Sequence, residues 1–189
     1  MVIRFYRVND AFGDFSNFAQ YEITIDDKVW PTSEHFFHAG KFTYNPRYQE
    51  RIRHANTPQY AANLGRDRHY PIRRDWDAVK DDYMRWAVLE KFAQHPDICD
   101  ILLETGDERI VEASPKDAYW GVGRDGRGRN MLGVILGEVR RELRAQKLYL
   151  GETNVIPFVS IPERLEGAAQ QNPAYLYRNN ILRKLKLVA

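Results

Sequence analysis

The segment from Trp30 to Lys41 constrains the fold more than any other. Its residues have the spacing of a helix, and one face of that helix carries ionisable side chains. A proline fixes the chain where the helix begins, and the Thr-Ser pair after it can accept hydrogen bonds from the first free amides. Glu34, His38 and Lys41 then fall at i, i+4 and i+7 and share one face. A core-facing stripe at this spacing is normally Leu, Ile or Val. Three ionisable groups there favour the wall of a pocket, and a solvated helix face is the alternative.

The composition of the chain narrows the class of protein. A length of 189 residues suits one domain, or one domain with an appendage. The 28 basic and 26 acidic residues give a net charge of +2, whereas a dedicated nucleic-acid binder usually has a clear basic excess. The single cysteine, Cys99, excludes an internal disulfide and a multi-cysteine zinc site. No apolar run approaches the ~20 residues that span a bilayer and no apolar signal core is present, so we expect a cytoplasmic protein without a membrane partner.

Periodicity and capping residues predict a helix-rich chain with a few short strands. Strands are predicted at 2–6, at 109–113, and at 21–25 paired with 29–30 as a hairpin. Helices are predicted at about 33–43, 47–54, 58–65, 76–94, 96–104 and 129–146. We expect the domain to cover 1–147. The proline-containing segment 148–189 is then a C-terminal extension that wraps the domain or contacts a partner.

Two loops carry side chains suited to gripping a planar heterocycle. Asn17 lies between Phe15 and Phe18, so that aromatic rings could stack on a base while the amide reads its edge. The strand ending near 113 leads into a polar, aromatic loop in which Asp117 could be an acid, a base or a ribose ligand and Trp120 could stack. Alternatively, these residues have only structural roles: Asn17 lies in a turn, the aromatic side chains belong to the core, and Asp117 caps a turn.

A glycine-rich loop offers a candidate anion site. Gly126-Arg-Gly-Arg-Asn130 leads straight into a helix, where glycines let backbone amides approach a ligand and the helix N-terminus favours an anion. It is neither a P-loop nor a dinucleotide-binding motif. Arg66 could supply a second anion contact, although exposed loop charges look the same in sequence. His35 and His38 are three apart and no His-Glu-x-x-His motif is present, so no metal or cofactor is expected.

Eight short segments occur in the order typical of one family. They are Phe15-Ser-Asn-Phe18, Trp30-Pro-Thr-Ser-Glu-His35, Ala39-Gly-Lys-Phe42, Gly65-Arg66, Leu103-Glu-Thr-Gly106, Val111-Glu112, Asp117-Ala-Tyr-Trp-Gly121 and Gly128-Arg-Asn-Met-Leu-Gly133. Together they resemble the signature of the NADAR family, also called YbiA-like, over roughly residues 3–146. The resemblance implies a compact, helix-rich α+β fold with a small β-sheet. It also implies hydrolysis of the N-glycosidic bond between a ribose and a base.

Two substrate classes follow from this resemblance. One is the ribosylamino-pyrimidine phosphate intermediates of riboflavin biosynthesis, which the overall similarity favours. The other is ADP-ribose attached to guanine in nucleic acid or a nucleotide, where the basic C-terminal segment would help the domain reach a polynucleotide. A non-catalytic module that senses ADP-ribose-like ligands is a third reading. The expected partner is therefore a phosphorylated ribosyl-base molecule, with ADP-ribosylated nucleic acid as the alternative.

The resemblance also implies catalytic roles. Breaking the C1′–N bond requires a proton donor for the leaving nitrogen and negative charge or a nucleophile near C1′. Glu34 can serve as the acid or base, and Asp117 completes the catalytic set. Lys41 could form a Schiff base with the opened ribose if burial lowers its pKa. It could instead only neutralise a carboxylate or bind phosphate.

The remaining predicted site residues bind the substrate. Base stacking is assigned to Phe18, Trp30 and Trp120, and reading of the base or ribose to Asn17 and Asp117. The phosphate end is assigned to Arg66, Arg129 and Asn130, and His38 and Tyr119 complete the binding set. One residue departs from the expected pattern: Gly40 stands where we expect a larger side chain, and its small size is expected to widen the pocket.

Overall fold

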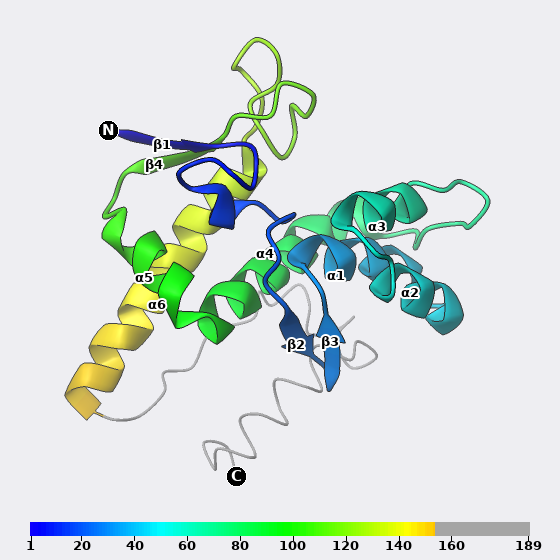
Figure 1. The fold of residues 1–189 in the computed structure, drawn as a ribbon, viewed down its shortest axis with the longest axis horizontal. Coiled ribbons are helices and arrows are strands. Elements are labelled where there is room, and N and C mark those ends of the chain that lie inside the picture. The colour runs from blue at the N-terminus through cyan, green and yellow to red at the C-terminus, as the bar shows by residue number, and fades with distance from the viewer. Residues whose placement is uncertain (154–189) are drawn as a thin grey trace.

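A computed structural model describes residues 1–153, with side chains described as far as Ala145. In this part of the chain, short strands near the N-terminus precede a run of helices, and strand β4 comes before the last helix (Figure 1). The elements are β1 (Val2–Phe5), η1 (Gly13–Phe15), β2 (Ile23–Ile25), β3 (Lys28–Trp30), α1 (Ser33–Ala39), η2 (Gly40–Phe42), α2 (Pro46–Arg53), α3 (Pro58–Gly65), α4 (Trp76–Gln94), α5 (Pro96–Glu104), β4 (Arg109–Glu112) and α6 (Met131–Thr153). The expected α+β, helix-rich fold is confirmed.

Helix α1 is the centre of the domain. All seven of its residues are buried, and it contacts α2, α3 and α4 (Figure 1). Thr32 caps it as predicted, because its side chain accepts a hydrogen bond from the His35 amide. The His35 ring bonds Thr32 Oγ1 at 2.8 Å and the Ala55 carbonyl at 3.0 Å, which satisfies a buried polar side chain. The solvated-face alternative for this helix is therefore wrong.

The helix predicted at 33–43 changes character at Gly40. The α-helix ends at Ala39, and a 3-10 turn, η2, carries the chain through Lys41. A Cβ at Gly40 would lie 2.6 Å from ring carbons of Tyr83 on α4. The small residue therefore makes room for a packed tyrosine, and the expectation that Gly40 widens the pocket is wrong.

Two separate two-stranded sheets replace the single small sheet expected. Strands β1 and β4 pair in parallel, with Val2 opposite Arg109. Strands β2 and β3 form the predicted antiparallel hairpin. Its turn places Asp26 and Asp27 at φ values of 53° and 57°, the left-handed conformation that tight hairpin turns need at both central residues. Strand β4 also packs on α6, so the parallel sheet covers one side of that helix (Figure 1).

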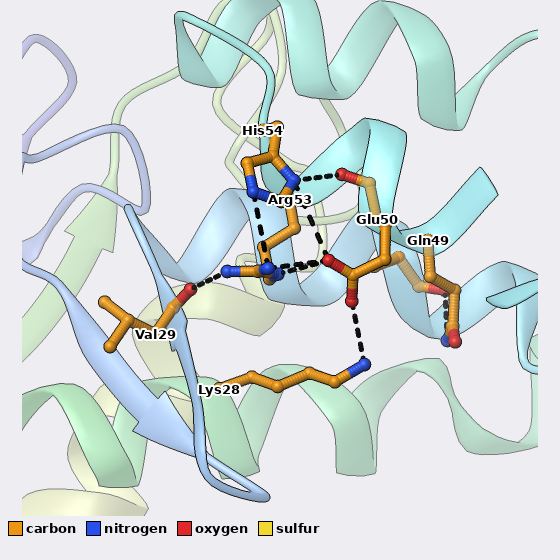
Figure 2. Close-up of polar contacts among 7 residues, drawn as sticks. Lys28, Val29, Gln49, Glu50, Arg53 and His54 are labelled. Atoms are coloured by element: carbon orange, nitrogen blue, oxygen red, sulfur yellow. Dashed lines mark hydrogen bonds and ion pairs between the residues drawn. The ribbon is translucent and has the colours of Figure 1, made fainter. Parts of the chain in front are cut away.

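An ion cluster fastens the hairpin to α2. Glu50 accepts hydrogen bonds from Lys28 Nζ at 2.8 Å and from Arg53 Nη2 at 2.6 Å (Figure 2). Arg53 also reaches the Val29 carbonyl at 3.1 Å. The guanidinium of Arg53, and then Lys28, lower the pKa of Glu50 to about 2. The cluster fixes β3 against α2 next to the start of α1.

The long helices α4 and α6 pack against each other and complete the core. An ion pair between Arg85 and Glu138 joins them. Helix α6 continues to Thr153, past the boundary predicted after residue 147. Most of the predicted extension, from residue 154 onward, lies outside the described residues. Across residues 1–153, no helix is long and apolar enough to cross a membrane.

Candidate functional site

Glu34 and His38 form a buried polar pair on α1. Glu34 Oε1 lies 2.9 Å from His38 Nε2, and the two side chains are 12% and 5% exposed. Burial lowers the pKa of His38, and the charge of Glu34 only partly opposes this. A neutral imidazole beside a carboxylate donates through Nε2–H, so His38 holds one oxygen of Glu34 in a fixed direction. The predicted i, i+4 relationship is thus a direct hydrogen bond.

Gly65, the last residue of α3, makes space for the His38 ring. A Cβ added at Gly65 would lie 2.1 Å from His38 Nδ1 and 2.5 Å from its Cγ. Any side chain at Gly65 would therefore move the ring that orients Glu34. The Gly65 carbonyl also accepts a hydrogen bond from Lys41 Nζ at 3.1 Å.

Lys41 places its amine in an apolar, aromatic environment. Its Nζ lies 5.5 Å from the centre of the Phe37 ring and 5.6 Å from that of Trp76. Burial lowers the pKa of Lys41 to about 8, with the charges of Arg66 and Arg68 acting in the same direction and that of Glu34 opposing them. A substantial fraction of this amine is therefore neutral in mildly alkaline solution, which is the form a nucleophilic lysine requires.

Glu112, the last residue of β4, is a site residue that was not predicted individually. Its Oε2 is buried and has no hydrogen-bond partner within the described part of the chain. Burial raises its pKa to about 7, and the charges of Asp117 and Glu34 add to the rise. Glu112 therefore lies within electrostatic reach of both of these carboxylates. A carboxyl that keeps its proton near neutral pH can donate that proton.

The side chain of Asn130 positions Glu112, which corrects its predicted role. Asn130 is 3% exposed; its Oδ1 accepts from the Glu112 amide and its Nδ2 donates to the Ile110 carbonyl, both at 2.8 Å. With both ends of its amide engaged in the core, this side chain is not available to a phosphate. Arg129, beside it, is exposed, and its guanidinium lies 5.3 Å from the centre of the Tyr119 ring.

The loop after β4 brings Asp117 and Trp120 to the same site. Asp117 Oδ1 accepts from the amides of Tyr119 and Trp120 at 2.8 Å each, so it caps a turn while its charge acts on Glu112. Trp120 is half-buried and meets the Phe37 ring edge-on, with centroids 5.3 Å apart. The ring of Phe37 also borders His38 and Lys41.

Tyr119 and Arg66 lie at two edges of the site. The Tyr119 hydroxyl donates to Asp81 at 2.8 Å, with the amine of Lys80 over its ring. Arg66 is exposed; it donates to Asn63 at 3.1 Å, and its charge lowers the pKa of Lys41.

Three predicted site residues at the N-terminal side have different surroundings. Trp30 is 6% exposed and packs edge-on against Phe36 in the core, so it is a packing residue and offers no open face to a base. Asn17 is buried, and its carbonyl accepts the Glu34 amide at 3.3 Å. Phe18, next to it, is half-buried. The structure therefore joins Asn17 to α1 and leaves Trp30 in the core.

The polar groups do not form a metal site of the usual kind. Among the described residues, no three His, Cys, Asp or Glu side chains are grouped to hold a metal ion. What the arrangement offers is a buried amine, a carboxylate held by an imidazole, and a second carboxyl whose pKa is near 7. Such a set can combine nucleophilic attack with proton transfer.

Comparisons with known proteins find similar sequences and a similar fold. The NADAR domain family matches residues 4–144. The chain is 47% identical to N-glycosidase YbiA of Escherichia coli over 146 residues, which is 77% of this chain and 91% of that protein. It is also 47% identical over 146 residues to an N-glycosidase of Nostoc punctiforme, covering 76% and 94% of the two chains. The NMR structure of the E. coli protein superimposes with a TM-score of 0.73 over 78% of this chain and 88% of that one.

A plant relative carries the same domain within a longer chain. The match to the chloroplastic riboflavin biosynthesis protein PYRR of Zea mays is 40% identical over 156 residues. It covers 75% of this chain and 25% of the plant protein.

Proposed function

This chain belongs to the NADAR family and is an N-glycosidase, and we propose that it hydrolyses ribosylamino-pyrimidine phosphates, intermediates of riboflavin biosynthesis. The observation that carries the proposal is the half-buried amine of Lys41, which lies against the rings of Phe37 and Trp76 and near the charge of Glu34. Relatives named riboflavin biosynthesis proteins, in Zea mays and Vibrio vulnificus, support this substrate class.

In the proposed reaction, Lys41 acts as the nucleophile. A ribosylamine opens to a protonated imine when the ring oxygen leaves C1′ and takes a proton from solvent, and the neutral Nζ of Lys41 then adds to C1′. Glu34 accepts the proton lost from Nζ, and Glu112 donates its proton to the departing amino nitrogen as the C1′–N bond breaks. Water then adds to the lysine imine, so the products are the aminopyrimidine and ribose 5-phosphate, with the lysine regenerated.

The surrounding residues orient the reactants. His38 holds Glu34, and Asn130 holds the backbone of Glu112. The half-buried ring of Trp120 is the candidate stacking surface for the base, and Arg66 and Arg129 are the candidate phosphate ligands. Asn17 would accept a hydrogen bond from the base through its side-chain oxygen.

A product assay tests the substrate class. Purified protein would be incubated with a ribosylamino-pyrimidine phosphate and, separately, with an ADP-ribosylated guanine nucleotide, and the products identified by mass spectrometry. We expect ribose 5-phosphate from the first and no ADP-ribose from the second. Release of ADP-ribose alone would assign the other substrate class, and binding of either compound without turnover would contradict the glycosidase mechanism.

The pH dependence of kcat/KM should be bell-shaped, because the reaction needs neutral Lys41 and protonated Glu112. The fraction of neutral Lys41 rises with pH through about 8, and the fraction of protonated Glu112 falls through about 7. The product of the two fractions is largest between these values. In Glu112→Gln the alkaline limb should disappear, since the group that loses its proton is gone, and the residual kcat/KM should rise to a plateau. A wild-type profile that stays flat through this range would contradict both assignments.

Gly65→Ala should lower kcat/KM by about 10²-fold, because the added methyl group collides with the His38 ring and shifts the carboxylate of Glu34. The matched control is Gly137→Ala on α6, where a Cβ would meet nothing within 4 Å. That change should leave kcat/KM unaltered and raise the free energy of unfolding by about 1 kcal/mol, as alanine favours a helix over glycine. Equal activity of the two variants would show that the orientation of His38 does not matter.

A further inference from the structure

Lys91 on α4 is a buried amine that the proposed reaction does not use. It is 1% exposed, and its Nζ donates hydrogen bonds to the backbone carbonyls of Asp14 and Ser16, the second at 2.9 Å. The ring of Tyr21 lies beside it, with its centre 5.1 Å from Nζ. Within the described residues, no carboxylate lies within ion-pairing distance of this amine. Two carbonyl oxygens at the end of η1 take the place of a counter-ion.

Burying an amine without a charged partner costs free energy, which its hydrogen bonds to the two carbonyls must offset. Lysine is rarely fully buried without a charged partner, since removing the ammonium from water is unfavourable. Burial lowers the pKa of Lys91 to about 7, and the charge of Asp14 opposes this. The amine can donate to both carbonyls in either protonation state, because an ammonium carries three N–H bonds and a neutral amine two. The contact therefore persists across neutral pH.

The carbonyls held by Lys91 belong to the loop that carries Asn17. This residue follows Ser16 directly, and its own carbonyl accepts the Glu34 amide in the first turn of α1 at 3.3 Å. The loop is thus fixed on one side by α4 and touches the helix bearing the catalytic carboxylate on the other.

Helix α4 also sets the direction of the Asn17 side chain. Asn17 Nδ2 lies 3.0 Å from the sulfur of Met84, which is on the same helix as Lys91. With the nitrogen facing Met84, the buried Oδ1 is left without a hydrogen-bond partner in the described region. An unpaired, buried carbonyl oxygen is a strong acceptor for an N–H donor supplied by a ligand. Aminopyrimidines carry such donors on their edges.

We propose that Lys91 is a positioning residue for base recognition: by holding Asp14 and Ser16, it places Asn17 Oδ1 to accept a hydrogen bond from an amino group of the base. The inference rests on the proposed function at one point, the contact of Asn17 with the substrate. It goes beyond that function in assigning selectivity for amino-bearing bases to a residue that does not touch the substrate.

A double-mutant cycle tests the coupling. Lys91→Met keeps most of the side-chain volume and removes both hydrogen bonds, and Asn17→Ala removes the acceptor. We expect each single variant to raise KM for a ribosylamino-pyrimidine phosphate by about tenfold, the effect of about one hydrogen bond, with a smaller change in kcat. If Lys91 acts through Asn17, the double variant should be no worse than Asn17→Ala. Effects of Lys91→Met and Asn17→Ala that multiply in the double variant would overturn the proposal.

Two further measurements separate positioning from general stability. Leu102→Ala on α5 leaves a cavity in the fully buried core and lowers stability without removing a hydrogen bond to residues 14–18. At a temperature where every variant is folded, Leu102→Ala should keep the wild-type KM. In Lys91→Met, backbone amides of residues 14–18 should exchange with solvent faster, and in Leu102→Ala they should not. Unchanged exchange in Lys91→Met, or a KM for Leu102→Ala raised to the same extent, would overturn the inference.

The single variants also distinguish failure of this inference from failure of the proposed site. If Asn17→Ala raises KM and Lys91→Met does not, the positioning role is wrong and Asn17 keeps its place in the site. If Asn17→Ala has the KM of the wild type, the assignment of Asn17 to the substrate is itself wrong, and the positioning role falls with it.

Discussion

Lys41→Met is expected to lower kcat by at least about 10³-fold, because the variant lacks the amine that we propose forms a covalent intermediate. Lys41→Arg should be about as inactive. Arginine keeps the positive charge, but its guanidinium does not lose a proton at neutral pH and cannot form an imine. Steady-state kinetics on a ribosylamino-pyrimidine phosphate would measure both variants, with substrate binding measured separately by calorimetry.

The comparison of the two Lys41 variants separates the two roles this residue could have. If Lys41 only neutralised a carboxylate or bound phosphate, Lys41→Arg would keep much of the wild-type kcat. The control is Lys28→Met, which removes an exposed lysine that pairs with Glu50. This control should keep full activity, so that loss of any lysine is distinguished from loss of the proposed nucleophile.

Glu34→Gln should lower kcat by roughly 10²–10⁴-fold, since the amide cannot accept a proton as the proposed base does. The residual activity should also have a shifted pH profile. The charge of Glu34 raises the pKa of Lys41 and also that of Glu112. Its removal lowers both pKa values, so both limbs of the kcat/KM profile move to lower pH. Rates measured across the pH range at limiting substrate would show the shift.

An exposed carboxylate provides the control for Glu34→Gln. Glu104 lies at the end of α5 on the surface, and Glu104→Gln should change neither the rate nor the profile. Loss of activity in Glu34→Gln with the pH limbs unmoved would contradict the electrostatic coupling between the three groups. Retention of the wild-type kcat would contradict the role of Glu34 as the base.

The parts of the site that depend on local spacing could be predicted from the sequence. The pairing of Glu34 with His38 is an i, i+4 relationship on one helix, and a capping threonine marks where that helix begins. Lys41 lies near the pair although the helix tightens at Gly40. The hairpin was predictable for the same reason, since two consecutive aspartates mark its turn.

The parts that depend on contacts between distant segments could not be predicted in this way. The pKa of Glu112 is raised because the end of β4 buries its side chain within reach of the charges of Asp117 and Glu34. Its position at the end of a strand leading into a polar loop was the available signal. Gly65 leaves room for the His38 ring where α3 packs against α1. The spacing of residues along the chain does not reveal this packing.

Residue type alone also gave a wrong prediction for two residues, Trp30 and Asn130. A tryptophan and an asparagine are as suited to binding a nucleoside as to closing a core. Trp30 packs against Phe36, and both ends of the Asn130 amide bond the backbone of β4. Burial, which a single sequence does not contain, decides between the two uses.

The most direct test of the account is to trap the covalent intermediate. The protein would be mixed with a ribosylamino-pyrimidine phosphate, reduced with borohydride during turnover, digested and analysed by mass spectrometry. A covalent mechanism through Lys41 predicts a ribose phosphate adduct on the peptide containing this residue, absent in Lys41→Arg. An enzyme that turns over the substrate normally and yields no adduct on Lys41 would contradict it.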